Sequence, residues 1–535
     1  MNTALPLSLS EKAITQWISL LGQTKVDTSL ETCQRYAQTC SATSYEVIAV
    51  LYPESKDDVL QILPVAEQYR IPVYPLSRGK NWGYGSSSPA SENNVIIDLS
   101  RMNRIVEVNS ELGYAVIEPG VTQDQLYRHL KENNTGLVLD ATGASPEASI
   151  VGNVLERGFG QSPYGDRFLH SSAMEVILAD GSIVHTGFSH YPHAKAAHIH
   201  KWGLGPYLDG IFTQSNFGII TQLTVWLLPE PEYDGLCIIR LPNDQAVAQT
   251  IDRLRSLRMR GLLRSTLHFA NDLRVLSTLR NFPYEKTKGT TPLPETLLEI
   301  MCKNHHIASW NAIGGIGGVK RDVHHTVREL RRCLRGIASV YFIPSRIGKL
   351  SKLIAQFTHP SSILRVNNDL FELMRGKPTH VPTRGVYWRK KSIPALESLQ
   401  PSLDRCGVMW CSPVLPSTER DVISLMNITR QTMEEFSLET NVALSLLNER
   451  ASCATVGLFY DRDDPNGDSV AQDCYHTLLD RYYAAGYIPY RYGINTSDAQ
   501  KTLFRSDDTF WNVCQRIKGA LDPSRIIAPG RYSIT

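Results

Sequence analysis

The stretch "SRGKNWGYG", residues 77–85, directly follows the apolar run "IPVYPL" and combines three glycines with two cations, an amide and two aromatic side chains. Glycines let a backbone adopt positive φ and approach a ligand closely, so that its N–H groups can point at a phosphate. Arg78 and Lys80 add positive charge. The stretch is neither a Walker loop nor a G-x-G-x-x-G that opens a helix, because a strand pattern follows it. A tight surface turn remains open as the alternative.

The composition limits the class of protein. The chain has 535 residues, 42% of them apolar and 20% charged, which is typical of a soluble globular protein of more than one domain. Its 55 basic and 53 acidic residues leave a net charge of +2, so neither nucleic acid nor an anionic membrane is an expected partner. No secretory signal and no long apolar run is evident, and the ten cysteines read as reduced thiols. We therefore expect a cytoplasmic protein.

The local patterns predict an α+β fold. A helix is expected over residues 55–70, with Ser55 as its N-cap, and strands are expected at "NVIIDL" and "YAVIEPG". Thr122 and Gln125 have the spacing of a capping box, and Asp180-Gly181 is expected to turn a hairpin.

After Pro231 the sequence pattern changes: it predicts helices with basic faces, followed by a helix–strand alternation around residues 417–460. The last fifty residues return to glycine and proline turns. We expect three segments: an N-terminal domain over 1–232, a second domain over 233–484, and a C-terminal segment over 485–535 that rejoins the first domain.

Two further segments change the interpretation of the opening stretch. They are "TGASPEASIVGNVLERGFGQSPYGDR" at 142–167 and "GLGPYLDGIFTQSNFGIITQLTVWLLP" at 203–229, and the chain ends in "LDPSRIIAPGRYSI". In this order and spacing they resemble the vanillyl-alcohol oxidase / p-cresol methylhydroxylase family of flavoproteins, most closely its subgroup that oxidises 4-substituted phenols. The resemblance covers most of 45–232 and about 485–535, but only patches of the middle segment, such as "MWCSPVLP". It implies a two-domain fold, an FAD-binding domain with an α/β cap.

The resemblance also implies where FAD is held. Residues 77–85 would wrap the pyrophosphate, residues 142–158 would contact the isoalloxazine and ribityl chain, and Ile219 and Ile220 would lie near the adenine. Arg531, in "APGRY", would lie by the flavin N1/O2 locus, where reduction places negative charge. The implied cofactor-binding residues are Ser77, Arg78, Gly79, Lys80, Asn81, Trp82, Thr142, Gly143, Ser145, Ser149, Gly152, Asn153, Glu156, Gly158, Ile219, Ile220 and Arg531.

The substrate side would be carried by Tyr84 and by the pair Tyr490-Arg491 in "GYIPYRYG". In the resembling enzymes two tyrosines and an arginine bind the phenol oxygen and favour phenolate, which then releases hydride from its para side-chain carbon. A permanent cation and two hydroxyl donors suit that oxygen. The ordinary alternative is a turn aromatic at Tyr84 and a strand end at Tyr490.

This chain departs from the family at the residues that bind FAD covalently. Val408, four residues before the "SP" of "MWCSP", stands where eugenol oxidase-like members have a histidine, and Asn81 stands where berberine-bridge relatives have one. Neither can form a histidyl bond, so we expect non-covalent FAD. A tyrosyl or cysteinyl link elsewhere stays open, with Cys406 and Cys411 nearby, beside the interpretation of these two cysteines as packed thiols.

Two more departures concern the pocket. Thr142, Gly143 or Ala144 replaces the aspartate that lies near the flavin N5 in relatives, and Gln161 replaces a tyrosine. The acid/base side of the site is therefore expected to differ from that of relatives. The expected pocket residues are Gln161, Val408 and Trp410.

A histidine-rich segment, residues 185–200, raises the possibility of a metal site, but no acidic or cysteine ligand is interleaved with its histidines. A solvated loop is the expected role, and no metal is predicted. Its members are His185, His190, His193, His198 and His200.

Three functions remain open at this point. The first is an oxidase that acts on a 4-substituted phenol or related hydroxyaromatic, and the second is a dehydrogenase that passes electrons to a cytochrome or another acceptor. The third is a flavin-binding protein with altered or lost catalysis. The expected partners are a small aromatic substrate, oxygen or an acceptor protein, and further copies of the chain in a homodimer or larger oligomer.

Overall fold

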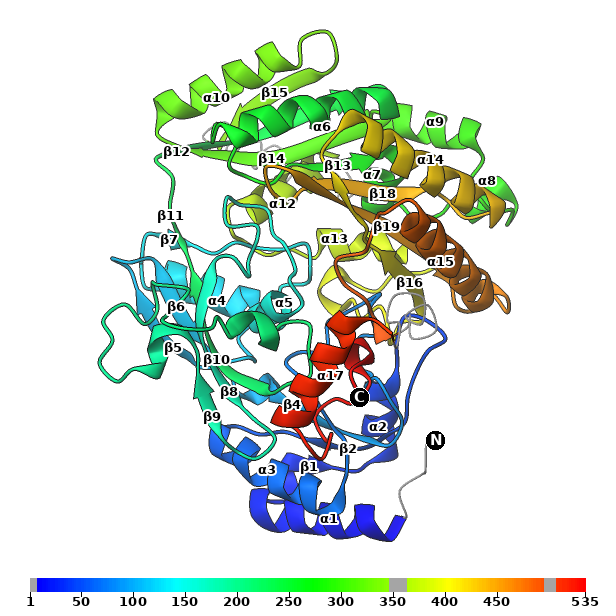
Figure 1. Ribbon diagram of the computed structural model, residues 1–535. Helices are drawn as coiled ribbons and strands as arrows, with labels where there is room; N and C mark the ends of the chain where they lie inside the picture. Colours follow the sequence, from blue (N-terminus) through cyan, green and yellow to red (C-terminus); the bar gives the residue numbers. More distant parts are fainter. Residues whose placement is uncertain (1–6, 346–362, 495–506) are drawn as a thin grey trace.

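The computed structural model describes residues 7–345, 363–494 and 507–535. The first sheet lies at the same end of the molecule as helices α1 and α3 (Figure 1). Its strand order is β1-β2-β4-β3, parallel except at β1. Every residue of β4 is buried, as expected for a parallel strand covered on both faces. The elements are α1 (Leu7–Leu21), β1 (Val26–Asp27), α2 (Leu30–Ala37), β2 (Val47–Leu51), α3 (Lys56–Tyr69), β3 (Val73–Leu76) and β4 (Asn94–Asp98).

The second sheet is antiparallel, with the order β5-β6-β10-β8-β9. Its elements are β5 (Ile105–Asn109), β6 (Tyr114–Ile117), α4 (Gln123–Glu132), α5 (Ile150–Leu155), β8 (Ser171–Ile177), β9 (Ile183–His185) and β10 (Ile219–Trp226). The short strands β7 (Leu137–Val138) and β11 (Leu228–Pro229) pair beside it. After β11 the chain continues into β12 (Tyr233–Leu241), the first strand of the third large sheet.

The cap is built on one antiparallel sheet, ordered β15-β12-β14-β13-β18-β19-β16, with β17 beside β19. Its strands are β12 (Tyr233–Leu241), β13 (His268–Asn271), β14 (Trp310–Gly318), β15 (Ser339–Pro344), β16 (Cys406–Cys411), β17 (Val414–Pro416), β18 (Asn441–Leu446) and β19 (Ala451–Asp461). Four helices cover its outer face: α6 (Asp244–Met259), α10 (Lys320–Cys333), α14 (Glu419–Glu435) and α15 (Gly467–Ala484) (Figure 1). Its inner side carries α7 (Asp272–Leu279), α12 (Ile363–Met374) and α13 (Val381–Arg384), while α8 (Tyr284–Thr287) and α9 (Glu295–Asn304) lie at one end.

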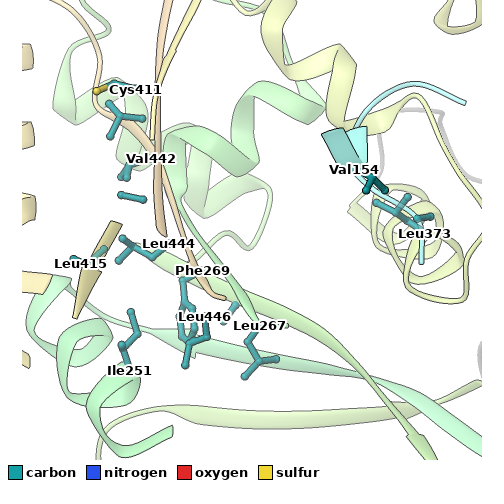
Figure 2. Packing of buried hydrophobic residues seen from close by; sticks show 14 of the residues in the cluster. Val154, Ile251, Leu267, Phe269, Leu373, Cys411, Leu415, Val442, Leu444 and Leu446 are labelled. Atoms are coloured by element: carbon teal, nitrogen blue, oxygen red, sulfur yellow. The ribbon is translucent and has the colours of Figure 1, made fainter. Parts of the chain in front are cut away.

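One apolar core runs through the second sheet and the cap. It includes Phe269 and Leu444 of the cap sheet, with Ile251 of α6 packed among them (Figure 2). Val154 of α5 and Leu373 of α12 belong to the same cluster. The cap is therefore joined to the N-terminal domain by buried apolar side chains and is not a separately packed body.

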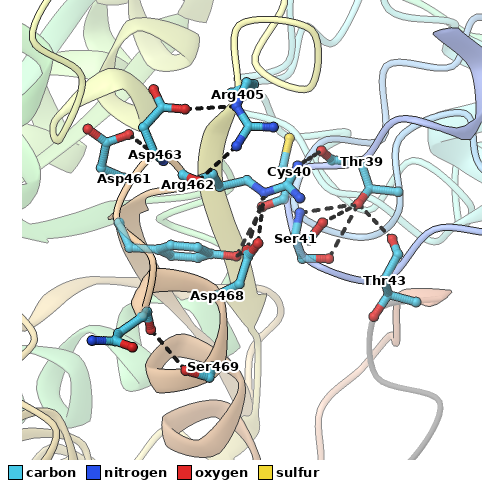
Figure 3. A network of polar contacts seen from close by, with 12 residues as sticks. Thr39, Cys40, Ser41, Thr43, Arg405, Asp461, Arg462, Asp463, Asp468 and Ser469 are labelled. Carbon is cyan, nitrogen blue, oxygen red and sulfur yellow. Dashed lines mark hydrogen bonds and ion pairs between the residues drawn. The ribbon is translucent and has the colours of Figure 1, made fainter. Parts of the chain in front are cut away.

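A polar network holds the cap to the N-terminal segment (Figure 3). Arg462 donates from Nη1 to the carbonyl of Thr39 at 2.8 Å, and the hydroxyl of Tyr460 donates to the carbonyl of Cys40 at 3.3 Å. Both side chains also bind Asp468. The cap is thus joined to the N-terminal domain by the shared apolar core and, separately, by these hydrogen bonds to the carbonyls of Thr39 and Cys40.

The C-terminal segment lies against the first sheet. After α17 (Thr509–Leu521), Ile527 pairs with Val73 of β3, and the amide of Ala528 donates to the carbonyl of Val73 at 2.7 Å. The fully buried Lys518 binds Asp522 at 2.6 Å and donates to the carbonyls of Asn216 and Ile527. Of the three expected segments, residues 1–6, 346–362 and 495–506 lie outside the described residues.

Local predictions about helices and turns are confirmed, with one exception. Ser55 caps α3, and Gly181 turns the hairpin of β8 and β9 with a φ of +82°. Thr122 accepts from the amide of Gln125, which is half of a capping box. The other half is absent, because the Gln125 side chain donates instead to the carbonyl of Asn103 at 2.7 Å. Within the described residues, no helix combines the length and apolar character that crossing a membrane requires.

Candidate active site

Two adjoining cavities lie where the cap meets the N-terminal domain. The large cavity has a volume of about 820 Å³ and is lined by the cap sheet, α7, α12 and the loop at residues 80–84. The small cavity, of about 210 Å³, lies between residues 74–81, residues 148–156, residues 212–220 and the C-terminal segment. Five residues line both cavities and mark their junction: Lys80, Asn81, Ala144, Asn153 and Arg491.

The glycines of residues 77–85 are required by close packing. Gly83 has a φ of +78°, and a Cβ atom there would lie 2.3 Å from Cδ1 of Trp410. The Trp410 ring in turn donates from Nε1 to the carbonyl of Trp82 at 3.1 Å. Gly152 of α5 lies as close to the loop from the other side, since its Cβ would meet Oγ of Ser77 at 2.5 Å. The loop is therefore clamped between α5 and the cap.

The two cations of this loop are held by protein groups. Arg78 donates to the carbonyls of Glu147 and Ser100 at 3.4 and 3.5 Å. Lys80 donates to the side-chain oxygen of Gln400 at 2.7 Å, and burial lowers the pKa of its ammonium. Both nevertheless line the small cavity, so their charge acts on whatever occupies it.

Tyr84, Tyr490 and Arg491 meet at the wall of the large cavity. The Arg491 guanidinium stacks on the Tyr84 ring, 3.9 Å from its centre, and donates to the side-chain oxygen of Asn81. Ser412 joins the tyrosines: its hydroxyl shares a hydrogen bond of 2.7 Å with the Tyr84 hydroxyl, and its carbonyl accepts from the amide of Tyr490 at 3.1 Å. Burial raises the pKa of both tyrosines, so their hydroxyls stay protonated and can donate.

A buried charge cluster lies beside this group. Glu156 pairs with Arg531 at 2.5 Å and with Arg491 at 3.5 Å, and it accepts from the Tyr532 hydroxyl at 2.9 Å. Burial alone would raise the pKa of Glu156, but the two guanidinium groups outweigh burial and lower it. The cluster carries one negative and two positive charges, which leaves net positive charge at the cavity junction. Nε of Arg491 is buried without a hydrogen-bond partner among the described residues, so one donor is left for a ligand.

Most of the expected site residues line one of the two cavities. In the small cavity lie Ser77, Arg78, Gly79, Lys80, Asn81, Ser149, Gly152, Asn153, Glu156, Ile219, Ile220 and Arg531. In the large cavity lie Trp82, Tyr84, Thr142, Gly143, Gly158, Gln161, Trp410, Tyr490 and Arg491.

Two expected residues line neither of these cavities. Ser145 is buried behind residues 142–144, and Val408 is fully buried in the cluster around Trp388 and Phe459. Cys406 and Cys411 also line neither, and burial raises the pKa of both thiols.

Sequence reasoning missed several residues that line the large cavity. Ser412 lies two residues after Trp410 in "MWCSP", and this short separation is the local signal that could have found it. His268 and Arg274 carry no recognisable motif. Burial lowers the pKa of His268 to about 4, so its imidazole is neutral, and Nδ1 shares a hydrogen bond of 2.7 Å with the Ser445 hydroxyl.

The histidine-rich segment has structural contacts. His198 shares a hydrogen bond of 2.7 Å with Thr224 and stacks on Tyr114, and His200 stacks on Phe188. In the described part of the chain, no group of three or more His, Cys, Asp or Glu side chains is arranged to hold a metal ion.

A glycine-rich loop lies against a narrow cavity, with cations at its junction to a wider one, and this arrangement suits the phosphates of a nucleotide cofactor. The residues present fit FAD, because Gly79 and Gly152 leave backbone exposed along the small cavity and Arg491 and Arg531 supply positive charge at its inner end. The sequence of residues 47–187 matches the family described as FAD binding domain.

The chain is 36% identical over 544 residues to the 1'-carboxy-chondrochloren decarboxylase of Chondromyces crocatus, covering 99% of this chain and 98% of that protein. It is 27% identical to the 4-cresol dehydrogenase [hydroxylating] flavoprotein subunit of Pseudomonas putida, covering 100% and 98%.

Two solved structures share the whole fold. The crystal structure of p-cresol methylhydroxylase with substrate bound matches with a TM-score of 0.88 at 26% identity, covering 99% of this chain and 98% of that one. The 4-ethylphenol oxidase of Gulosibacter chungangensis, in its isoeugenol complex, matches with a TM-score of 0.90 at 25% identity, covering 100% and 99%. The chain belongs to the vanillyl-alcohol oxidase / p-cresol methylhydroxylase family and is an FAD-dependent oxidoreductase.

Proposed function

We propose that this enzyme removes a hydride from the para side-chain carbon of a 4-substituted phenol or related hydroxyaromatic. The observation that supports it is the meeting of Tyr84, Tyr490 and Arg491 at one wall of the large cavity, with the Arg491 Nε still without a partner among the described residues. Two protonated hydroxyls and one permanent cation are the groups that would stabilise a phenolate oxygen.

The charges on these side chains suit the reaction. Because the pKa values of Tyr84 and Tyr490 are raised, both act as neutral donors, and the substrate hydroxyl is the group that gives up its proton. Arg491 then lies against the phenolate and holds it by charge. The phenolate pushes electron density toward the para carbon, which loses hydride and leaves a quinone methide. FAD, when bound, accepts that hydride.

A second candidate is loss of CO2 after the hydride step. The C–C bond to a carboxylate on the next carbon would break, its electron pair would form a C=C bond, and the quinone methide would return to phenolate. One similar protein is a decarboxylase by name. Arg274 in the large cavity has no carboxylate partner among the described residues, and its guanidinium also favours an anionic substrate.

The test is an anaerobic titration of the purified enzyme with a panel of para-alkylphenols, followed at the flavin absorbance. We expect bleaching of the oxidised flavin by at least one 4-alkylphenol and none by the matching 4-alkylanisole, which cannot form phenolate. A panel in which no phenol bleaches the flavin, while photoreduction does, would contradict the proposal. Oxygen consumption by the reduced enzyme then separates an oxidase from a dehydrogenase.

We also propose that the enzyme assembles as a homodimer or larger oligomer, as its family resemblance implies. Light scattering at micromolar concentration should give at least twice the mass of one chain. A monomeric mass would contradict the proposal.

A further inference from the structure

Arg274 is a cation in the large cavity that the proposed hydride step does not use. It lies on α7, on the inner side of the cap sheet. Its guanidinium stacks over the Trp410 ring at 4.7 Å and lies 5.8 Å from the centre of the Phe459 ring. Nη1 donates to the side-chain oxygen of Asn441 at 2.9 Å. Aromatic faces and one neutral amide therefore surround the charge.

Two other arginines of the cap are neutralised by carboxylates, whereas Arg258 and Arg384 are bound by backbone carbonyls. Arg389 pairs with Glu439 at 2.8 Å, and Arg430 pairs with Asp244 at 2.6 Å. Arg274 has no such partner among the residues that the structure describes, and burial lowers the pKa of its guanidinium to about 10. A desolvated cation without a counter-ion costs stability, so its retention in a cavity indicates an anionic ligand.

The position of Arg274 relates it to the phenolate site. The Trp410 ring under its guanidinium donates to the carbonyl of Trp82, in the loop that also carries Tyr84. Arg491 stacks on the ring of that same Tyr84. Arg491 thus lies beside the tyrosine pair and Arg274 lies across Trp410, and three further cations, Lys80, Arg240 and Arg331, also line the cavity.

We propose that Arg274 binds a carboxylate carried on the para side chain of the substrate. This inference rests on the proposed function, since it places the phenol oxygen at Arg491 and the carboxylate at Arg274. A guanidinium presents parallel N–H donors that match the two oxygens of a carboxylate. The Arg274 guanidinium lies against two aromatic rings and carries one positive charge, which suits a singly charged carboxylate better than a doubly charged phosphate. Arg274 is a binding residue that selects and orients the substrate, and it takes no part in bond breaking.

The test compares two probes that differ only in charge: 3-(4-hydroxyphenyl)propanoate and its methyl ester. Each is titrated anaerobically into wild-type holoenzyme, and the apparent Kd is taken from the saturation of the flavin-reduction rate. We expect the wild type to bind the acid about 10- to 100-fold more tightly than the ester, which is the range of a charge-assisted hydrogen bond to an ion. Equal affinity for the two probes would overturn the inference.

Variants of Arg274 test whether this residue is the one that binds the carboxylate of the probe. In Arg274→Gln the preference for the acid should disappear while the ester is bound as before, and Arg274→Lys should keep part of it. Arg384→Gln is the matched control: this arginine of α13 donates to the carbonyl of Thr278 at 2.8 Å and lies outside the cavity lining, so the preference should persist. If Arg274 only held Trp410 and Asn441 in place, Arg274→Gln would weaken both probes equally, and the inference would be wrong.

The outcomes also separate this inference from the proposed function. If the ester reduces the flavin as readily as the acid does, and Arg274→Gln changes neither rate, the inference of a carboxylate site is wrong while the proposed phenol oxidation stands. Failure of both probes and of every neutral phenol to reduce the flavin removes the proposed function and the inference with it.

Discussion

The Arg491 guanidinium contacts an aromatic ring, an amide oxygen and a carboxylate at the same time. It stacks on Tyr84, binds Asn81, and pairs with Glu156. Replacement by lysine keeps a positive charge but loses the planar fork that makes these contacts together. We expect Arg491→Lys to slow flavin reduction by a phenol by about 10- to 1000-fold, roughly 1.4–4 kcal/mol of transition-state stabilisation. Stopped-flow absorbance of the flavin measures this rate.

The tyrosines should act as a unit with this arginine. Tyr84→Phe and Tyr490→Phe should each slow the same step, and the double variant should lose less than the product of the two effects. Arg384→Lys is the control outside the cavity and should reduce as fast as wild type. Unchanged rates in all three site variants would show that the substrate is not held by this group.

The attachment of FAD also depends on single residues. Asn81 lines the cavity junction but cannot form a histidyl bond, and Val408 is buried away from both cavities. The thiols of Cys406 and Cys411 are buried with raised pKa values, which disfavours the reactive thiolate. Acid precipitation should therefore release the flavin to the supernatant. Yellow colour retained in the washed pellet would mean that another side chain forms a covalent bond.

At the scale of an element, the glycine loop depends on close approach to the cap. Gly83→Ala adds a methyl group 2.3 Å from the Trp410 ring at a φ of +78°. Positive φ alone costs about 1–2 kcal/mol for a residue with a Cβ, and the clash must move the loop or the ring as well. We expect weaker FAD binding and a lower Tm, measured by flavin fluorescence during a thermal scan.

Gly136→Ala separates strain from clash. Gly136 has a φ of +69°, but a Cβ there meets nothing within 4 Å. This control should lower the Tm by the strain alone and leave FAD affinity unchanged. Equal effects of the two substitutions on FAD affinity would contradict the packing argument.

At the scale of the whole molecule, a buried ion pair inside the C-terminal segment, Lys518–Asp522, holds the Lys518 ammonium where it also donates to the carbonyl of Asn216 in the N-terminal domain. Both Lys518 and Asp522 have fully buried side chains, and Asp522 also accepts from the amides of Ile526 and Ile527. Lys518→Met leaves a buried carboxylate without its cation, which should cost about 3–5 kcal/mol of unfolding free energy. Denaturant unfolding measures this loss.

An exposed ion pair provides the comparison. Arg128 pairs with Asp124 on the surface of α4, with 66% of its side chain exposed. Arg128→Met should change the unfolding free energy by less than about 1 kcal/mol. A similarly small loss for Lys518→Met would mean that the C-terminal segment is held mainly by its strand pairing and apolar contacts.

The sequence by itself determined the elements whose causes are local. An N-cap such as Ser55 and a turn such as Asp180-Gly181 act over a few residues, so their signals are complete in the sequence. The glycine loop was predicted because its composition and its order among other motifs are also properties of the sequence. The side chain of Gln125 was predicted wrongly, since its partner Asn103 comes from another segment.

Only the tertiary structure decided the walls of the cavities. Ser412 reaches Tyr84 across 328 positions of sequence, and Arg274 meets Asn441 across 167. Val408 and Trp410 share a strand, yet only Trp410 lines the large cavity. The reason is physical: a cavity is the space that long-range packing leaves unfilled, and Arg274 lacks a counter-ion among the described residues only because folding has placed their carboxylates elsewhere. No local pattern in the chain records either outcome.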